Sequence, residues 1–325
     1  MDAATARPIT AAEAVQYLCD AESVTVLSHV HPDADTLGSA LAVATALSRA
    51  GTAVRVSFPG PHVLPRSLRL LPGLDHIVEP DQLDESADLV VVVDCSSADR
   101  LGELAGHIHG PGTTLVIDHH RTNTGFGDSA LVDPHSQSTT VIVTTILRKW
   151  GVGIDVDIAQ CLYAGLVTDT GGLSRADTTS LRLAADLLET GFDGAELLRG
   201  LMDSHPYAWL PMLGTVLARA ELDRDAVAGR GLVHTVIRID DAQHVGWEEV
   251  ESVVDIVRTA EEAEVAVVLK EQPGGRWAVS MRSRGAVDVA ETARSLGGGG
   301  HHSAAGYSAH GSREAVLIEL RAALG

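Results

Sequence analysis

Hydrophobic and polar positions in the first half of the chain follow two alternating patterns. Short runs rich in β-branched residues predict strands, and the unbroken apolar run in Asp88–Val93 (DLVVVV) is typical of a strand buried on both faces of a parallel sheet. Longer segments between these runs have the spacing of helices. Strands that alternate with helices predict a doubly wound parallel sheet, which is an α/β fold. We expect strands at Ser23–Ser28, Ala53–Ser57, Asp88–Val93 and Thr113–Ile117, and helices at Thr36–Ala50, Ser138–Trp150 and Val156–Thr168.

The pattern changes after Gly191. Residues 193–222 have the character of helical connectors, interrupted by Pro206 and Pro211, and a second, smaller α/β segment follows. The glycine run Gly297–Gly300 is short and bounded, which favours a loop. We predict a first domain over residues 1–192, a helical linker over 193–222 and a second domain over 223–325. In the second domain we expect strands near Leu232–Arg238, Glu264–Lys270 and Trp277–Arg282, and helices at Trp247–Thr259, Val287–Leu296 and Arg313–Leu324.

The charge of the chain restricts its partners. Among 325 residues there are 24 Lys and Arg against 44 Asp and Glu, and the formal net charge of −20 repels long DNA or RNA. Aromatic residues make up only 3%, so few side chains are available to stack on the bases of a long single strand. A small anionic substrate can still bind where metal ions reverse the field inside one cleft. The composition therefore excludes long nucleic acid from the expected partners and favours bound metal.

Cysteine usage and the start of the chain indicate a reducing compartment. Cys19, Cys95 and Cys161 are odd in number and lack a CxxC pattern, which argues against a disulfide framework or a structural zinc site. Residues 1–21 carry acidic side chains and no long apolar run, and no stretch of about 18 apolar residues occurs elsewhere. We therefore expect a cytoplasmic protein that does not associate with membranes.

Four groups of aspartate and histidine lie at or near the ends of predicted elements. Because the carboxyl ends of parallel strands open into one crevice, groups far apart in the sequence can converge there. The four groups are His29–Asp35 (HVHPDAD), Asp94 directly after the DLVVVV strand, Asp118-His119-His120 directly after the next strand, and Asp169 at the end of a predicted helix.

The residue types in these groups favour divalent metal ions. Carboxylate and imidazole without thiolate suit manganese or magnesium better than structural zinc. Asp33, Asp35, Asp94 and Asp169 carry four negative charges, which two divalent cations would balance and which would otherwise repel one another. Two ions about 3.5–4 Å apart can share one carboxylate, activate a bridging water and stabilise both the attacking and the leaving oxygen.

Each pattern also has a purely structural interpretation. A single aspartate after a strand is commonly a helix N-cap, and a lone His-His pair is commonly packing. Asp155 and Asp157 resemble a metal pair, yet they open a predicted helix and favour capping. His107–His109 precedes Gly110-Pro111-Gly112 and favours an exposed turn. Four patterns in order favour the functional interpretation of the main groups.

These motifs resemble those of the DHH phosphoesterase superfamily, and the resemblance spans nearly the whole chain. The subgroup that it indicates contains stand-alone bacterial nanoRNases and 3′-phosphoadenosine-5′-phosphate (pAp) phosphatases, some of which also cleave cyclic di-AMP or its linear product pApA. In the first domain the resemblance rests on His29–Ser39 (HVHPDADTLGS), Val91–Arg100 (VVVDCSSADR), Val116–Asn123 (VIDHHRTN) and Gly165–Gly172 (GLVTDTGG). In the second it rests on Met281–Ser283 and Gly297–Gly306 (GGGGHHSAAG), which resemble the DHH-associated domain.

The resemblance implies a role for each residue of the four groups. His120 would donate a hydrogen bond to the phosphate, Asp118 would orient the histidines, and a metal-bridging hydroxide would attack phosphorus. The metal ligands that it implies are His29 and Asp33 for the first ion, Asp35, His119 and Asp169 for the second, and Asp94 between them. Manganese is the expected metal, with magnesium or cobalt as alternatives.

The second domain would bind the substrate. The resemblance implies that Arg282, Ser283 and His301 grip its terminal phosphate or sugar, and that the backbone amides of Gly298, Gly299 and Gly300 approach the anion. The alternative is a flexible hairpin loop with an incidental histidine pair, in which His302 is the more variable member. Arg121 and Asn123 could also reach substrate, and His31 stands where many members have Asn.

The function implied is hydrolysis of short nucleotides: pAp to AMP, short oligoribonucleotides, pApA or cyclic di-AMP. Chemistry at one end and binding at the other would select short substrates. A homodimer is what the resemblance suggests. An inorganic pyrophosphatase is an alternative, although pyrophosphatases of a related family carry a different second domain. A catalytically inactive nucleotide sensor is another, although every expected metal position is filled.

Overall fold

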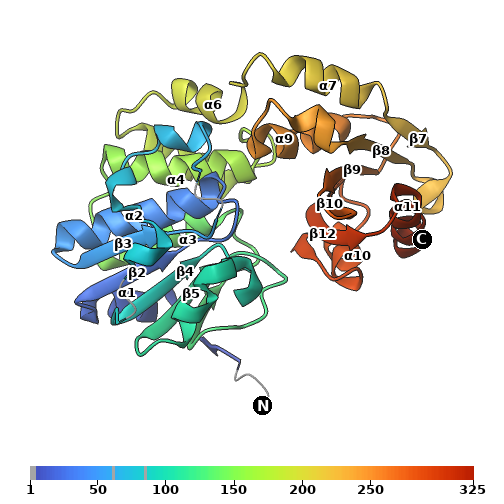
Figure 1. Cartoon of the computed structure of the whole chain (residues 1–325). Helices are drawn as coiled ribbons and strands as arrows, with labels where there is room; N and C mark the ends of the chain where they lie inside the picture. The colour runs from blue at the N-terminus through green and yellow to red at the C-terminus, as the bar shows by residue number, and fades with distance from the viewer. Residues whose placement is uncertain (1–4, 61–62, 84–85) are drawn as a thin grey trace. The chain divides into compact units, whose positions relative to one another are not determined.

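The contacts within the chain divide it into two units. The computed structural model describes residues 5–60, 63–83 and 86–325, and the units are Met1–Ser204 and His205–Gly325 (Figure 1). The division falls inside the segment 193–222, for which we expected helical connectors. Among the described residues, no helix combines the length and the apolar character that crossing a membrane requires.

A six-stranded parallel sheet forms the centre of unit 1. Its spatial order is β1-β6-β5-β4-β2-β3, so the chain runs from β2 outward to one edge and then returns to the other side of β2. The crevice between the carboxyl ends of β2 and β4 is therefore a topological switch point, where ligands bind in such sheets. The predicted parallel α/β fold is confirmed. The strands are β1 (Arg7–Pro8), β2 (Ser23–Leu27), β3 (Ala53–Ser57), β4 (Leu89–Val93), β5 (Thr113–Asp118) and β6 (Ser129–Val132).

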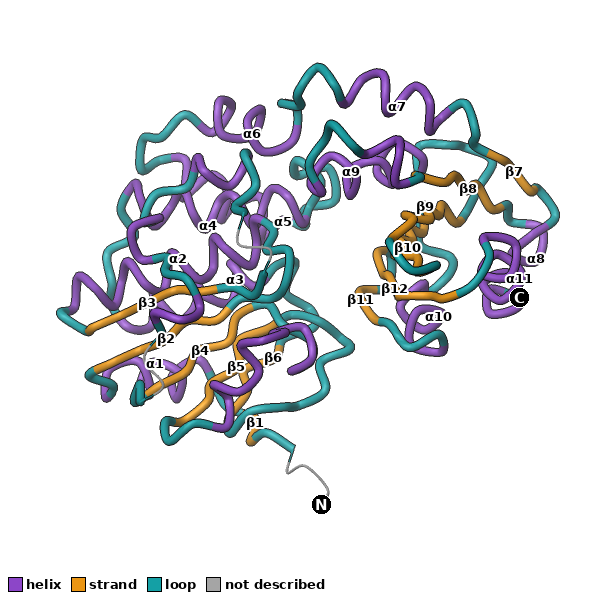
Figure 2. Tube along the Cα trace, in the orientation of Figure 1, coloured by secondary structure: helices purple, strands orange, loops and turns teal. Residues whose placement is uncertain are grey.

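Both faces of this sheet are covered. On β4, Val91 and Val93 pack under the α-helices, whereas Val90 and Val92 pack against the 3-10 helix η4 (Ala98–His109), which explains the unbroken apolar run. Figure 2 shows α2, α3 and α4 along one face of the strands. The α-helices are α1 (Ala11–Asp20), α2 (Ala34–Ala50), α3 (Thr139–Trp150), α4 (Val156–Asp169), α5 (Thr178–Leu188) and α6 (Gly194–Met202), and shorter 3-10 helices are η1 (Ser67–Leu70), η2 (Leu74–His76) and η3 (Pro80–Gln82).

A mixed six-stranded sheet forms the centre of unit 2. Its order is β11-β12-β10-β9-β8-β7, and the pairing is antiparallel except between β8 and β9. Helices α7 and α9 pack on one face, and α10 and α11 on the other. The strands are β7 (Glu221–Asp223), β8 (Leu232–Ile237), β9 (Val265–Gln272), β10 (Arg276–Ser283), β11 (Gly299–His301) and β12 (Ala304–His310), and the helices are α7 (Trp209–Leu217), α8 (Ala226–Gly229), η5 (Ile239–Ala242), α9 (Trp247–Val257), α10 (Val289–Ser295) and α11 (Arg313–Leu324).

Three local expectations need correction. Gly299 and Gly300 lie in strand β11 rather than in a loop, and β12, its partner, was not expected because its sequence (AAGYSAH) has little β propensity. Pro211 does not interrupt a helix, since it lies in the first turn of α7, where backbone N–H groups have no partner within the helix. His107–His109 is not an exposed turn: it ends η4, and Ile108 is buried.

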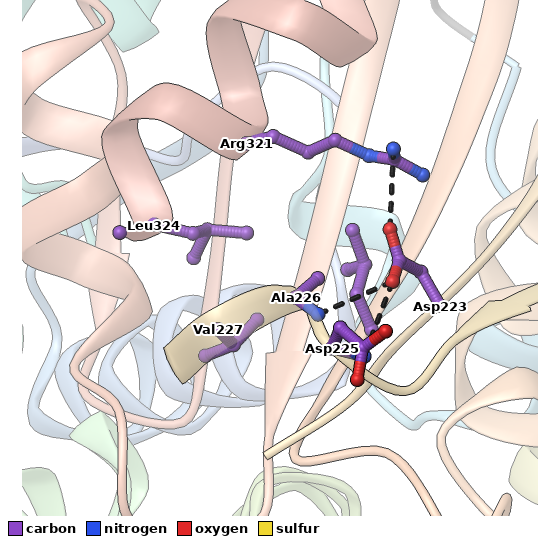
Figure 3. Close-up of a pocket in the computed structure, with 8 residues that line it drawn as sticks. Asp223, Asp225, Ala226, Val227, Arg321 and Leu324 are labelled. Atoms are coloured by element: carbon purple, nitrogen blue, oxygen red, sulfur yellow. Dashed lines mark hydrogen bonds and ion pairs between the residues drawn. The ribbon is translucent and has the colours of Figure 1, made fainter. Parts of the chain in front are cut away.

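A hollow of about 350 Å³ lies in unit 2 beside α11 (Figure 3). Two of its charged groups form an ion pair: Arg321 Nη1 lies 3.2 Å from Asp223 Oδ2, and Asp223 Oδ1 accepts hydrogen bonds from the backbone of Asp225 and Ala226. The residues that line it include none of the site residues predicted from the sequence. We therefore assign it no part in the chemistry.

Candidate functional site

Side chains from distant segments of unit 1 converge at the carboxyl edge of its sheet. His29 follows β2 and Asp94 follows β4, so the two flank the switch point between these neighbouring strands. The other contributors come from the start of α2 (Asp33 and Asp35), the end of β5 (Asp118, His119 and His120) and the end of α4 (Asp169). The structure thus brings together the six residues that the sequence predicts as metal ligands. Their binding of metal stays a prediction.

The first group consists of His29, Asp33 and Asp94. His29 Nε2 lies 3.6 Å from Asp94 Oδ2 and 3.8 Å from Asp33 Oδ2. The other ring nitrogen of His29 lies 2.8 Å from the carbonyl oxygen of Val30, which can only accept, so Nδ1 donates and Nε2 is turned toward the carboxylates. Asp33 is the N-cap of α2, and its Oδ1 accepts from the backbone N–H groups of Asp35 and Thr36. Its second oxygen is directed at the group.

The second group consists of Asp35, Asp94, His119 and Asp169. His119 Nε2 lies 3.3 Å from Asp169 Oδ2, 3.5 Å from Asp94 Oδ1 and 3.7 Å from Asp35 Oδ2. His119 Nδ1 lies 3.2 Å from the carbonyl oxygen of Ser136, which orients the ring as in the first group. One imidazole nitrogen therefore faces three carboxylates.

Asp94 belongs to both groups through different oxygens. Oδ2 faces His29, and Oδ1 faces His119. Its backbone has φ 57°, in the left-handed region, and its N–H donates to Ile117 at 2.9 Å. Non-glycine residues in that region cost about 1–3 kcal/mol and cluster at functional sites. The conformation keeps this carboxylate between the two groups.

Asp118 and His120 form a pair beside Asp94. His120 Nδ1 lies 2.7 Å from Asp118 Oδ1, which also accepts from the backbone N–H groups of His119 and His120. Asn123 donates to the other oxygen of Asp118 at 2.6 Å. Asp118 is wholly buried, so its position is fixed by these bonds. Asn123, which the sequence suggested as a substrate contact, is seen here to orient Asp118.

Electrostatics at the site show a cost that metal ions would relieve. Burial, followed by the charge of Asp94, raises the pKa of Asp35 well above its ordinary value. Burial and then Asp35 do the same to the pKa of Asp169. Burial also acts to raise the pKa of Asp94, but the neighbouring imidazoles of His29 and His120 outweigh it and hold that pKa well below its ordinary value. Divalent cations would keep all of these carboxylates ionised.

The donor set fits divalent ions that prefer oxygen and nitrogen ligands. Cys95 adjoins Asp94, but burial raises the pKa of its thiol to about 12, so it is neutral near pH 7 and does not supply a thiolate. Its Sγ donates to the carbonyl oxygen of Ser97 at 3.1 Å. The available donors are therefore carboxylate oxygens and imidazole nitrogens, which suit manganese and magnesium.

In unit 2, Arg282 and His301 lie in one row across three strands. Both pair with Ala304 of β12, Arg282 from β10 and His301 from β11. Directly opposed residues of antiparallel strands point to the same face, so the two side chains flank Ala304 on one face of the sheet. Ser280, Gly306 and Gly299 form the next row, which gives a floor of small residues. This arrangement suits a phosphate or sugar held between two basic side chains.

The other predicted substrate residues are bonded within unit 2. Ser283 follows Arg282 and so points to the opposite face, where its hydroxyl donates to Glu264 at 3.0 Å. The N–H of Gly298 donates to Ala293 at 2.7 Å, and a Cβ on Gly298 would lie 2.1 Å from a β12 carbonyl oxygen, so packing requires this glycine. His302 contacts the Gly285 carbonyl oxygen and Asp288. A substrate role for Ser283 and Gly298 stays a prediction.

Sequence reasoning missed three residues that contact the proposed metal ligands. Thr36 and Thr139 donate their hydroxyl groups to Asp94, and Gly165 leaves room for Asp35, since a Cβ there would lie 2.5 Å from Asp35 Oδ1. Thr36 and Gly165 lie inside motifs quoted above, and the Ser/Thr-rich start of α3 was the available signal for Thr139. Asp155 and Asp157, which resemble a metal pair in the sequence, have the expected structural role. Asp155 caps α4, and both side chains form ion pairs with Arg49.

Comparison with protein families identifies two domains in the chain. Residues 23–166 match the N-terminal domain of the DHH family, and residues 230–324 match the DHHA1 domain. The bifunctional oligoribonuclease and PAP phosphatase NrnA of Thermus thermophilus is 34% identical over 88% of this chain and 84% of its own length. This chain belongs to the DHH family. The resemblance inferred from the motifs is confirmed, and membership makes the chain a metal-dependent phosphoesterase by class.

A further relative differs in its named activity, and a solved structure shares the fold. The cyclic-di-AMP phosphodiesterase GdpP of Geobacillus thermodenitrificans is 24% identical over 88% of this chain and 44% of that protein. The crystal structure of an exopolyphosphatase-related protein from Bacteroides fragilis superposes with a TM-score of 0.85 at 24% identity, covering 97% of this chain and 95% of the other. That likeness supports the two-unit DHH fold and carries no substrate information.

Proposed function

We propose that this DHH-family chain hydrolyses short nucleotides at a site that holds two divalent metal ions, with manganese as the expected metal. The observation that carries the proposal is the position of Asp94, which directs one oxygen at His29 and the other at His119. His29 and Asp33 would complete one metal site, and Asp35, His119 and Asp169 the other. When bound, two such ions supply an activated water and positive charge for the phosphoryl oxygens.

The protein's own contribution to the chemistry centres on His120. Asp118 Oδ1 accepts a hydrogen bond from the Nδ1–H group of His120 at 2.7 Å and fixes the orientation of the ring. Burial alone would lower the pKa of His120, but the hydrogen bond to Asp118 outweighs it and raises the pKa, which favours the charged ring. We infer that Nε2 then donates to a phosphoryl oxygen, where a charged donor gains strength as negative charge develops.

The net charge of the chain and two basic side chains of unit 2 both favour a short substrate. The net charge of −20 disfavours long polyanions, while Arg282 and His301 offer a local pair of basic groups over a floor of small residues. The names of relatives agree with short substrates: oligoribonucleotides and pAp for one, cyclic di-AMP for another. We therefore propose pAp, short oligoribonucleotides, pApA and cyclic di-AMP as the substrate class.

The proposed setting is a cytoplasmic homodimer. The three cysteines, Cys19, Cys95 and Cys161, are free thiols, which fits a reducing compartment. The dimer is proposed from the family resemblance. Light scattering of the purified chain would test it, and a mass equal to one chain at all concentrations would contradict it.

A substrate panel with product identification tests the function. The purified chain with Mn²⁺ would be offered pAp, pApA, cyclic di-AMP, pyrophosphate and RNAs of increasing length. We expect turnover of short nucleotides and a steep fall with RNA length. Efficient degradation of long strands, or turnover of pyrophosphate alone, would contradict the proposal, and tight nucleotide binding without product would indicate a sensor.

A further inference from the structure

Two threonine hydroxyl groups hold the Asp94 carboxylate from opposite sides. Thr36 Oγ1 donates to Asp94 Oδ2 at 2.5 Å, and Thr139 Oγ1 donates to Asp94 Oδ1 at 2.9 Å. Thr36 lies in the first turn of α2, and Thr139 is the first residue of α3. Both are completely buried, so no solvent competes for these bonds.

The two bonds fix the one torsion that decides where the carboxylate oxygens point. The terminal torsion of an aspartate side chain is broad and roughly two-fold, so the carboxylate rotates easily when nothing restrains it. Each carboxylate oxygen has two acceptor positions, and one bond from a threonine leaves the other position for a metal ion. With a donor on each oxygen, Oδ2 stays on the side of His29 and Oδ1 on the side of His119.

Thr139 connects Asp94 to a second ligand. Its backbone N–H donates to Asp35 Oδ2 at 2.7 Å, and the N–H of Thr140 donates to Asp35 Oδ1 at 2.9 Å. Ser138, the N-cap of α3, makes no capping bond with its side chain, so the carboxylate of Asp35 satisfies the start of this helix instead. The side chain and the backbone of one residue therefore orient two carboxylates.

We infer that Thr36 and Thr139 are positioning residues that divide Asp94 between two metal sites. Thr36 serves the site with His29 and Asp33, and Thr139 serves the site with Asp35, His119 and Asp169. This inference rests on the proposed two-metal function. It predicts that the loss of one hydroxyl weakens one site and leaves the other.

Substitution by valine removes each hydroxyl and retains the shape of the side chain, while serine retains the hydroxyl. Mn²⁺ binding to the metal-free protein would be measured by titration calorimetry and by the paramagnetic resonance signal of free Mn²⁺. We expect two sites per chain in the wild type. T36V and T139V should each lose about 10- to 100-fold affinity at one site, the range for residues that orient metal ligands. T36S and T139S should bind within a few-fold of the wild type.

Double mutants assign each threonine to its site. T36V added to His29→Ala should cause no further loss, because the site is already disabled, whereas T36V added to Asp169→Asn should weaken the remaining site. T139V should show the opposite pattern. At saturating Mn²⁺ the KM for pAp should stay at the wild-type value, while the Mn²⁺ concentration for half-maximal activity rises.

The outcomes separate the inference from the proposed function. Wild-type affinity in both valine variants, or equal weakening of both sites by either one, would overturn the division of Asp94 while the two-metal function stands. Fewer than two sites in the wild-type protein would overturn the function itself. T36A and T139A, which also remove the hydroxyl, replace any valine variant whose metal-free circular dichroism shows that it does not fold.

Discussion

The two units present their functional residues in opposite ways. In unit 1 the proposed metal ligand Asp94 and the orienting residue Asp118 are almost or wholly buried, and their oxygens accept hydrogen bonds from neighbouring side chains. In unit 2, Arg282 is only partly buried, and its Nε bonds to Asp255, whose side chain is 50% exposed. Rigid placement suits chemistry, where small displacements are costly, and an open surface suits substrates of several kinds. We therefore propose that residues of unit 1 set the rate and that residues of unit 2 set the affinity for substrate.

The largest effect should come from removing the charge shared by both groups. Asp94→Asn keeps the shape of the side chain but weakens both proposed metal sites, so we expect kcat to fall by roughly 1,000-fold or more. Steady-state assays with pAp and Mn²⁺ measure this. Asp99→Asn is the matched control, because Asp99 is exposed on η4 and should keep nearly normal activity. A near-normal rate for Asp94→Asn would remove the basis of the comparison.

Disturbing the orientation of His120 should have the next largest effect. Asp118→Asn replaces the charged acceptor of His120 Nδ1 and should lower kcat by about 100-fold, in the range of a lost proton donor. The KM should change little, since we propose that unit 2 holds the substrate. An increase in KM with unchanged kcat would show that this pair binds substrate instead.

Truncation in unit 2 should alter affinity alone. Arg282→Ala should raise the KM for pAp about 10-fold, as expected for one charged hydrogen bond, with kcat nearly unchanged. Arg258→Ala removes the same charge from a side chain that pairs with the same Asp255, and it should leave the KM unaltered. If Arg282→Ala lowered kcat and spared the KM, the division between rate and affinity would be wrong.

The smallest effect should appear in stability without metal. Because its folded-state pKa is raised, Asp169 binds its proton more tightly in the folded protein, so stability rises as pH falls through that pKa toward the ordinary value of about 3.9. Asp169→Asn should therefore stabilise the metal-free protein near pH 7, by on the order of 1 kcal/mol. Melting curves with and without Mn²⁺ test this.

The variant should also reduce the stabilisation that Mn²⁺ gives to the wild type. Destabilisation of the metal-free protein by Asp169→Asn would contradict the account of charge repulsion at the site. Asp186→Asn is a suitable control, since Asp186 is exposed in an ion pair with Arg148 and lies outside both groups.

The sequence was sufficient for the four strands β2 to β5 of the parallel sheet and for the residues gathered at its edge, whereas β1 and β6 were not expected. Runs such as DLVVVV identify strands buried on both faces, and the topology of such a sheet places His29 and Asp94, which follow β2 and β4, at one crevice. The motifs also indicated the family, and the comparisons confirm it.

Other features of the fold and the candidate site could not be predicted, because they depend on contacts between elements distant in the sequence. Thr36 and Thr139 reach Asp94 across 58 and 45 positions, so their role follows only from the packing of α2 and α3 against the end of β4. Strand β12 was missed because alanine, glycine and serine give little indication of a strand until a partner is in place. The bond from the Ser283 hydroxyl to Glu264, 19 positions away, could not be inferred from composition.

The division of Asp94 between two ions is most directly tested by anomalous scattering from a crystal grown with Mn²⁺. The account predicts two anomalous peaks per chain, one beside Asp94 Oδ2 and His29 and one beside Asp94 Oδ1 and His119. A single peak, or two peaks that both lie on the same oxygen of Asp94, would contradict it.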